Sequence, residues 1–289
     1  MNFHHCWKLR DWIPMHKLDW TTLSANPMAM YLLESNFEKI DFTHLSKNPS
    51  AIHTLEKNLD KIDWINLSLN PSAIHLLERN PDKINWRNLC CNTSSNPVII
   101  HLFEKNLDKI TWAFISLSQN PSVIQLLEAN PDKIDWIMLS ANPLAIHLLE
   151  ANPHKINWSC LSTNPSAIHI LEKNLDKIRW DSLCENPSAI HLLEANIDRI
   201  DSEILSENKS AIHLLEKYPY FIVWEILSAN PSAIHLLKKN KYRINWFEIS
   251  GNTAIFELDL DFFHRRMDII REELLEKAWH PSRFEKWCL

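Results

Sequence analysis

A unit of 22 residues recurs along most of the chain, and this periodicity constrains the fold more than any other feature. One copy reads NPSAIHLLERNPDKINW, from Asn70 to Trp86. Repetition at a fixed short period is typical of stacked supersecondary units, each of which buries an apolar face against its neighbours. The sequence therefore predicts one array of about eleven repeats instead of two separate globules.

The first half of each repeat has the pattern of a short amphipathic helix. Asn70 suits the N-cap position, and Pro71 suits the first helical position, where its missing N–H costs nothing. Apolar residues then fall on one face, and polar residues fall on the other. The apolar positions are Ala73, Ile74, Leu76 and Leu77. The Asn-Pro spacing lengthens before Asn96 and Asn120, which indicates two short loop insertions.

The second half of each repeat predicts a second, shorter helix. Asp63 can cap a helix whose buried face contains Trp64 and Leu67, with Ile62 packing just before it. Two antiparallel helices per repeat give an all-α solenoid. The alternative is a leucine-rich-repeat-like α/β solenoid, in which KIDW would be a strand. The period fits that family, but Leu67 stands where its pattern requires asparagine.

Gly251 is the only glycine in the chain, whereas asparagine is abundant. Helix ends often need a residue that tolerates a left-handed backbone, and asparagine is the usual substitute for glycine. We therefore expect residues such as Asn80 to end the first helix in a left-handed conformation.

A tryptophan recurs once per repeat, between apolar neighbours, and this pattern favours a buried stacking core over an exposed ligand-binding ladder. The predicted stacking core consists of Trp64, Trp86, Trp112, Trp136, Trp158, Trp180, Trp224 and Trp246, with Trp20 also in the row. Phe42 and Ser202 replace tryptophan in two repeats. Because Ser202 lacks the large side chain, we expect a weaker stack and a hinge near residues 200–222.

The residues directly after each tryptophan vary most between repeats, so we expect them to carry binding specificity. The candidate partner-binding residues are Ile65, Asn66, Arg87, Asn88, Phe114, Ile137, Met138, Asp181 and Glu203. If the second helices line the inner curve, the apolar members form a groove for a protein partner. The alternative is neutral variation on a solvated surface.

Histidine and lysine also recur once per repeat. The histidines precede a glutamate by three residues, as His75 precedes Glu78, which predicts a solvated pair on one helix face. The lysines alternate with acidic residues, so they resemble a solvated edge more than a phosphate-binding track. No glycine-rich loop, nucleophile motif or metal-binding motif occurs. The sequence predicts no enzyme, catalytic residue, cofactor or metal; His4, His5 and Cys6 are a weak exception.

Composition narrows the setting of the protein. The net charge of −6 is spread along the chain, which makes nucleic acid an improbable partner. No apolar run is long enough to span a membrane, and no signal peptide is evident, so we expect an intracellular protein. Six cysteines lack disulfide or CxxC spacing, and we expect reduced thiols. They are Cys6, Cys90, Cys91, Cys160, Cys184 and Cys288.

The ends of the chain read as caps for a solenoid, since a terminal repeat would otherwise expose its stacking face. We expect an N-terminal cap at residues 1–19, the repeat array at residues 20–253 and a C-terminal capping segment at residues 254–289. The repeat NPSAIHLLExNPDKIDWxxLS and the HPSRF segment from His280 to Phe284 resemble uncharacterised repeat proteins of giant DNA viruses of amoebae. The resemblance covers nearly the whole chain and implies a viral protein in the host cytoplasm or the virion; it brings no known activity.

These observations predict a non-enzymatic scaffold or adaptor that binds a host or viral protein. A self-associating structural component of the virion or viral factory is the second hypothesis. A nucleic-acid-binding solenoid is the third.

Overall fold

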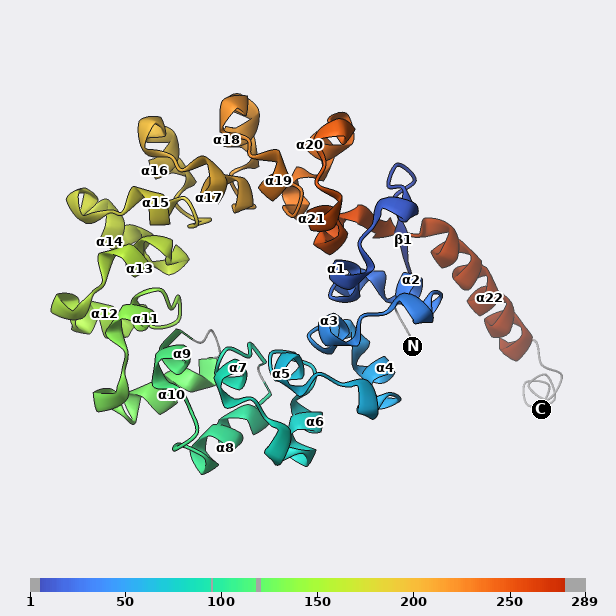
Figure 1. Ribbon diagram of the computed structural model, residues 1–289, viewed down its shortest axis with the longest axis horizontal. Helices are drawn as coiled ribbons and strands as arrows, with labels where there is room; N and C mark the ends of the chain where they lie inside the picture. The colour runs from blue at the N-terminus through green and yellow to red at the C-terminus, as the bar shows by residue number, and fades with distance from the viewer. Residues whose placement is uncertain (1–5, 95, 118–120, 279–289) are drawn as a thin grey trace, which may run out of the picture.

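The computed structural model describes residues 6–94, 96–117 and 121–278, and its short helices form two concentric rows that curve into a ring (Figure 1). The inner row consists of α1 (Trp20–Ser24), α3 (Phe42–Ser46), α5 (Trp64–Leu67), α7 (Trp86–Cys90), α9 (Trp112–Leu117), α11 (Trp136–Ser140), α13 (Trp158–Thr163), α15 (Trp180–Leu183), α17 (Ser202–Glu207), α19 (Trp224–Leu227) and α21 (Trp246–Gly251). The outer row consists of α2 (Met30–Glu34), α4 (Ile52–Glu56), α6 (Ile74–Arg79), α8 (Val98–Lys105), α10 (Pro121–Glu128), α12 (Ile146–Ala151), α14 (Ile168–Glu172), α16 (Ile190–Ala195), α18 (Ile212–Lys217) and α20 (Ile234–Lys239).

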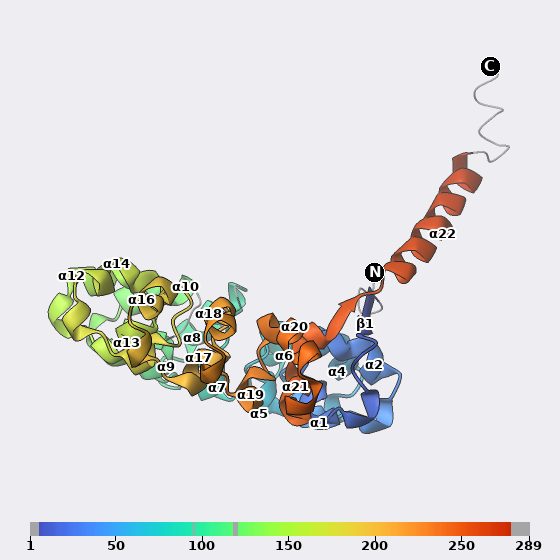
Figure 2. The ribbon, with the colours of Figure 1, turned by 90° about the horizontal axis from the view of Figure 1, so that it is seen from above.

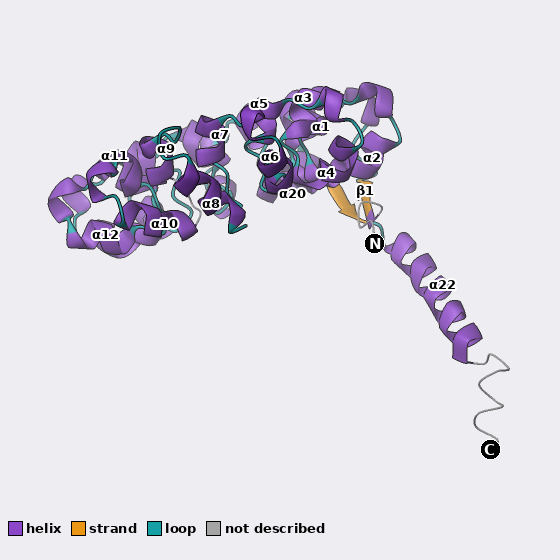
Figure 3. Cartoon of the chain, turned by 90° about the horizontal axis from the view of Figure 1, so that it is seen from below, coloured by secondary structure: helices purple, strands orange, loops and turns teal. Residues whose placement is uncertain are grey.

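The predicted all-α repeat solenoid is confirmed, and the leucine-rich-repeat alternative is wrong. Within the described residues, the strands are β1 (Trp7–Leu9) and β2 (Phe256–Leu258), which both lie outside the repeats. The segment that the alternative made a strand is a 3₁₀ turn at Leu59–Lys61 followed by the start of α5. The remaining helix, α22 (Leu260–Ala278), follows β2 and leaves the ring (Figures 1 and 3).

Polar side chains set the helix starts, as the sequence predicts. Asn48 Oδ1 accepts the Ser50 N–H at 3.0 Å, which begins a 3₁₀ turn that leads into α4. Asp63 Oδ1 accepts the Asn66 N–H at 2.9 Å and caps α5. At α2, α4, α14 and α20 the outer element is therefore a 3₁₀ turn followed by a short α-helix, whereas α10 (Pro121–Glu128) is one continuous helix.

The expected left-handed caps are wrong. No described residue has a positive φ, and Asn80 has φ −132° and ψ 60°. Asn80 instead ends α6 with its side chain, because its Nδ2 donates to the Leu76 carbonyl at 2.9 Å. A side-chain donor can satisfy a carbonyl at a helix end without the backbone reversal that glycine permits, so the scarcity of glycine has no structural cost here.

The asparagine of each Asn-Pro pair also joins neighbouring repeats. Asn164 is buried, and its Nδ2 donates at 3.0 Å to the carbonyls of Ser140 and Asn142 in the preceding repeat. The same contacts recur at Asn48, Asn70, Asn92, Asn186 and Asn252. We call this row the asparagine ladder. Each member caps its own repeat with its oxygen and binds the previous repeat with its nitrogen.

One member of the asparagine ladder differs from the sequence-based alignment. Asn96 was expected at this position, but Asn92 makes the ladder bonds to Ser68 and Asn70, at 2.9 and 3.1 Å. Asn96 instead accepts the Val98 N–H at the start of α8. Asn92 performs both tasks of a ladder member, since its Oδ1 also accepts the Ser94 N–H at 2.9 Å, and Asn96 adds a second cap after the insertion. Asn120 lies outside the described residues.

A row of small side chains forms a second ladder beside the asparagines. Ser46 Oγ donates to the Phe42 carbonyl at 2.7 Å and accepts the Asp63 N–H of the next repeat at 3.0 Å. Cys184 takes the same position and accepts the Asp201 N–H at 3.3 Å. The hydroxyl is buried and fully used, which explains why a polar residue recurs inside the stack.

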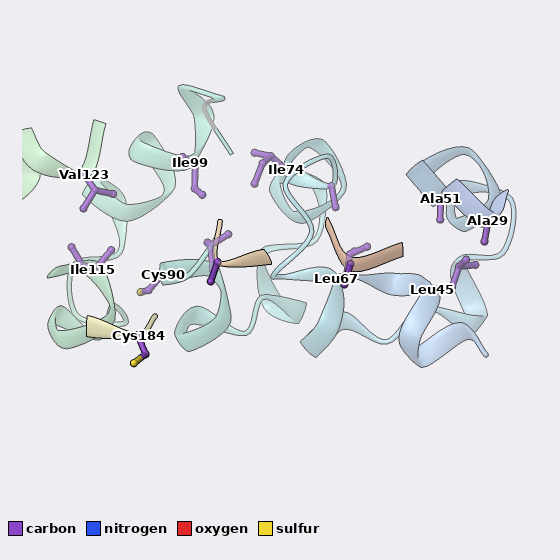
Figure 4. Packing of buried hydrophobic residues seen from close by; sticks show 14 of the residues in the cluster. Ala29, Leu45, Ala51, Leu67, Ile74, Cys90, Ile99, Ile115, Val123 and Cys184 are labelled. Carbon is purple, nitrogen blue, oxygen red and sulfur yellow. The ribbon is translucent and has the colours of Figure 1, made fainter. Parts of the chain in front are cut away.

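The apolar core follows the ring between the two rows of helices. Leucines of the inner helices belong to one buried cluster with the alanines and isoleucines at the start of the outer segments, and this cluster includes Leu67 and Ile74 (Figure 4). Ala73, Leu67 and Leu77 are fully buried. Each repeat thus shares one continuous core with its neighbours, which is the property that makes such arrays cooperative.

The first and last repeats contact each other through the same bonds that join internal neighbours. Asn26 Nδ2 donates at 3.2 Å to the carbonyls of Ser250 and Asn252, and the Asp19 N–H donates to Ser250 Oγ at 2.8 Å. In Figure 1, α21 lies beside α1. The array is therefore a closed ring, and we call this contact the closing junction.

The segments predicted to be caps have a different arrangement in their described parts. Strand β1 pairs antiparallel with β2 across the closing junction, and Arg10 binds the Ala254 carbonyl and the Glu257 carboxylate. A 3₁₀ turn at Met15–Lys17 precedes α1 as equivalent turns precede the other inner helices. The two ends of the chain thus complete one unit together. Because each terminal repeat stacks on the other, neither needs a cap.

Candidate functional site

All nine candidate partner-binding residues lie on inner helices. Ile65 and Asn66 lie on α5, Arg87 and Asn88 on α7, Phe114 on α9, Ile137 and Met138 on α11, Asp181 on α15, and Glu203 on α17. Ile65 and Ile137 are more than half exposed, at 58 % and 53 %. The structure therefore leaves large apolar side chains in solvent on the inner row, although α5 and α11 lie on different parts of the ring (Figure 1).

Some of the nine residues contribute to the contacts between repeats. Asn88 Nδ2 donates to the Ile65 carbonyl at 2.9 Å. The Arg87 guanidinium lies 4.8 Å from the centre of the Phe114 ring, which joins α7 to α9. Arg87, Asn88 and Phe114 are therefore less available to a partner than Ile65, Ile137 and Asp181.

The tryptophans lie half-buried at the junctions and pack against the core. Lys39 Nζ lies 4.5 Å from the Trp20 ring centre, and Lys155 Nζ lies 4.3 Å from the Trp136 ring centre. The same contact occurs across the closing junction, from Lys17 to Trp246. A cation over an indole face is worth about 0.5–1 kcal/mol at an exposed site. The recurring lysines thus form contacts between repeats. The prediction that they form a solvated edge did not include this role.

The ring and the cation both differ from the usual pair at Ser202, whereas Phe42 keeps its cation, Lys61. Ser202 stands in the tryptophan position, and Phe221 stands where the next repeat elsewhere has lysine or arginine. Phe221 is half-buried against the core and lies 4.4 Å from Tyr220, measured between ring centres. A large ring therefore stands at the second position of the pair, where other repeats have a cation, and Ser202 stands at the first. The hinge expected near residues 200–222 stays a prediction.

This exchange predicts strong coupling between the two positions. Phe221→Lys alone should lower the free energy of unfolding by about 2 kcal/mol, because apolar packing is lost and no indole is available. Adding Ser202→Trp should recover at least about 1 kcal/mol of that loss. Urea unfolding of both single variants and the double variant measures the coupling. The same cycle on Trp158→Ser and Lys177→Phe is the matched control, and additive effects at both pairs would contradict the exchange.

An acidic hollow lies at the edge of the inner row, between α17, α19 and α21. It is open, has a volume of about 510 Å³, and is lined by Glu203, Glu207, Lys209, Glu225 and Glu248 among others. Four carboxylates and one ammonium give a local charge of about −3. A smaller hollow beside it shares Glu207 and Lys209. Only Glu203 was a candidate from the sequence, although Glu225 and Glu248 occupy equivalent variable positions after their tryptophans.

The histidines pair differently from the prediction. His75 Nε2 contacts Glu56 Oε1 of the preceding repeat at 3.0 Å, and the same bond joins His169 to Glu150 at 2.9 Å. The predicted pairing within one helix occurs at His101 and Glu104, at 3.9 Å. These exposed pairs run along the outer helices and connect neighbouring repeats. Exposed polar pairs of this kind contribute little each to the free energy of folding.

Two of the buried thiols, Cys90 and Cys184, occupy the position that serine has in other repeats, whereas Cys91 is exposed and Cys160 is partly exposed. Burial raises the pKa of Cys90 to about 11, and burial also raises the pKa of Cys184. The structure contains free thiols at every cysteine that it describes. Both thiols are therefore neutral near pH 7, which suits their structural position in place of serine and does not suit a nucleophile.

The described residues also contain no metal-ligand cluster and no membrane-spanning helix. No three potential metal ligands come together there, and no described helix is long and apolar enough to cross a membrane. His4, His5 and the segment from His280 to Phe284 lie outside the described residues. No family model, curated protein or solved structure matches the chain.

Proposed function

We propose that this chain is a non-enzymatic protein-binding ring that holds a basic, partly apolar segment of another protein against its inner helices. The supporting observation is that the shared and the variable positions of each repeat differ in their contacts. The recurring asparagine, serine, tryptophan and lysine are engaged at the junctions, whereas the variable residues after each tryptophan include the exposed Ile65, Ile137, Asp181 and Glu203.

The acidic hollow supports a basic partner. Glu203, Glu207, Glu225 and Glu248 line one concave surface beside Lys209. Carboxylates that share a concave surface attract lysine and arginine side chains, and complementary charge raises the rate of association as well as specificity. The same charges repel a phosphate backbone, so a nucleic-acid partner is less well supported. The exposed Ile65 and Ile137 give apolar side chains of a partner further places to bind on the inner row.

Charge reversal on the inner helices tests this proposal. Glu203→Lys combined with Glu225→Lys should weaken binding of the partner by at least about tenfold, because two attractive charges become repulsive. The control is Glu78→Lys combined with Glu104→Lys on the outer helices α6 and α8, which changes the net charge equally. The partner is first captured with tagged protein from cells at moderate salt, and its affinity is then measured by calorimetry.

The outcomes separate the hypotheses. A stoichiometric protein that binds wild type and the outer-helix control, but not the inner-helix variant, supports the proposal. Equal binding by all three proteins would exclude the acidic hollow. Recovery of the chain alone as an oligomer would favour a self-associating structural component. The viral origin and the location in host cytoplasm or virion stay predictions of the sequence resemblance.

A further inference from the structure

Helix α22 projects away from the ring. Figures 2 and 3 show it leaving from β2 and pointing outward, with no other described element running alongside it. Its 19 residues correspond to a length of about 28 Å. No described part of the ring therefore packs along the length of α22.

The outward helix carries one continuous apolar stripe. Leu260, Phe263, Met267, Ile270 and Leu274 are spaced alternately by three and four residues, which is the heptad pattern of a helix that packs along another helix. Leu260, Met267 and Leu274 are each 62 % exposed, and Phe263 is 37 % exposed. Large apolar side chains that stay in solvent along about four turns of the helix indicate a missing partner helix.

The charges beside the apolar stripe indicate which helix would pack against α22. Arg266 and Glu273 flank the stripe on one side, and His264 and Arg271 flank it on the other. In a parallel pair of identical helices, Arg266 would face Arg271 of the second copy, and the two cations would repel. In an antiparallel pair, Arg266 faces Glu273 of the second copy, and symmetry makes this favourable contact twice.

The apolar layers also match in the antiparallel arrangement. Met267 would lie against Ile270 of the second copy, and Phe263 against Leu274 of the second copy. Leu260 would cover the aliphatic stem of Lys277 of the second copy. The helix is thus self-complementary in shape and in charge. We propose that the protein forms a homodimer through antiparallel pairing of α22, with one ring at each end of the helix pair.

The test is sedimentation velocity on the full chain from nanomolar to high micromolar concentration. We expect a reversible monomer–dimer equilibrium, since two short heptads of contact are modest. Met267→Asp should leave a monomer. Ile269→Asp is the matched control, because Ile269 lies off the stripe and is 46 % exposed, and this variant should dimerise as wild type does. A monomer at every wild-type concentration, or equal loss in both variants, would overturn the proposal.

A charge swap tests the orientation independently. Arg266→Glu should weaken the dimer by at least about tenfold, because it places two pairs of carboxylates together. Arg266→Glu combined with Glu273→Arg should restore it. Tighter dimerisation of Arg266→Glu would instead show a parallel pair, in which the repulsion from Arg271 had been removed, and the antiparallel proposal would fail. Circular dichroism and the ring's unfolding transition check that each variant remains folded.

Discussion

Asn164→Ala is expected to lower the free energy of unfolding by about 4 kcal/mol. The side chain is buried and makes three hydrogen bonds, each of 3.0 Å. Two go to carbonyls of the preceding repeat, and one comes from the Ser166 N–H of its own repeat. Each bond contributes about 1 kcal/mol, and the unpaired buried groups and the small cavity add to the loss.

Asn152→Ala is the matched control for this substitution. The Asn152 side chain donates one bond of 2.9 Å, to the Leu148 carbonyl of its own repeat, and it is only partly buried. We expect a loss of about 1 kcal/mol there. Urea unfolding followed by circular dichroism measures both variants. If the two asparagines cost the same, the asparagine ladder does not hold the repeats together.

Features that arise within one repeat could be predicted from the sequence. The cap at Asp63 and the turn at Asn48 depend on neighbours two or three residues away, so a single copy of the repeat contains the whole pattern. The apolar face of α6 follows from spacing alone, and Ala73, Ile74 and Leu77 are buried as expected. Recurrence over the whole array then establishes the solenoid.

Contacts between repeats were less accessible, because a repeated residue gives no sign of which copy it contacts. The bond from Asn164 to Ser140 spans 24 residues, and that from His169 to Glu150 spans 19. The histidine pattern fits a pair within one helix equally well, so spacing alone led to the wrong partner. The exchange at Ser202 and Phe221 could not be predicted from the sequence alone. It depends on the contact in which the cation of one repeat lies over the indole of the preceding repeat.

Closure of the ring is the feature that is hardest to predict from the sequence. Eleven units that complete one turn rotate by about 33° each, and no single residue encodes so small an angle. The sequence gives one indication of closure, which is that each end of the array carries part of a repeat. The turn at Met15–Lys17 is the part at the first end, and the turn capped by Asn252 is the part at the other. A capped open array would place similar apolar residues at its ends, so these signs alone do not discriminate.

Opening the ring is the second large effect that we expect. Asn26→Ala combined with Arg10→Ala removes the two ladder bonds to Ser250 and Asn252, and it removes the bonds from Arg10 to Ala254 and Glu257. At an internal junction the polypeptide connects the two neighbouring repeats, so they stay close even when their contacts are lost. The closing junction has no such covalent link, so a loss of about 5 kcal/mol there should separate the two ends before the repeats unfold.

Small-angle X-ray scattering, extrapolated to zero concentration, should therefore show a larger radius of gyration for the Asn26 and Arg10 variant. Hydrogen exchange should accelerate at the Arg10, Asp19 and Asp259 amides, which bond across or beside the closing junction to Ile255, Ser250 and Cys6. Asn164→Ala should lose comparable stability at an internal junction without this expansion. Because the two variants remove similar ladder bonds, expansion in both or in neither would show that the closing junction is not what holds the ends together.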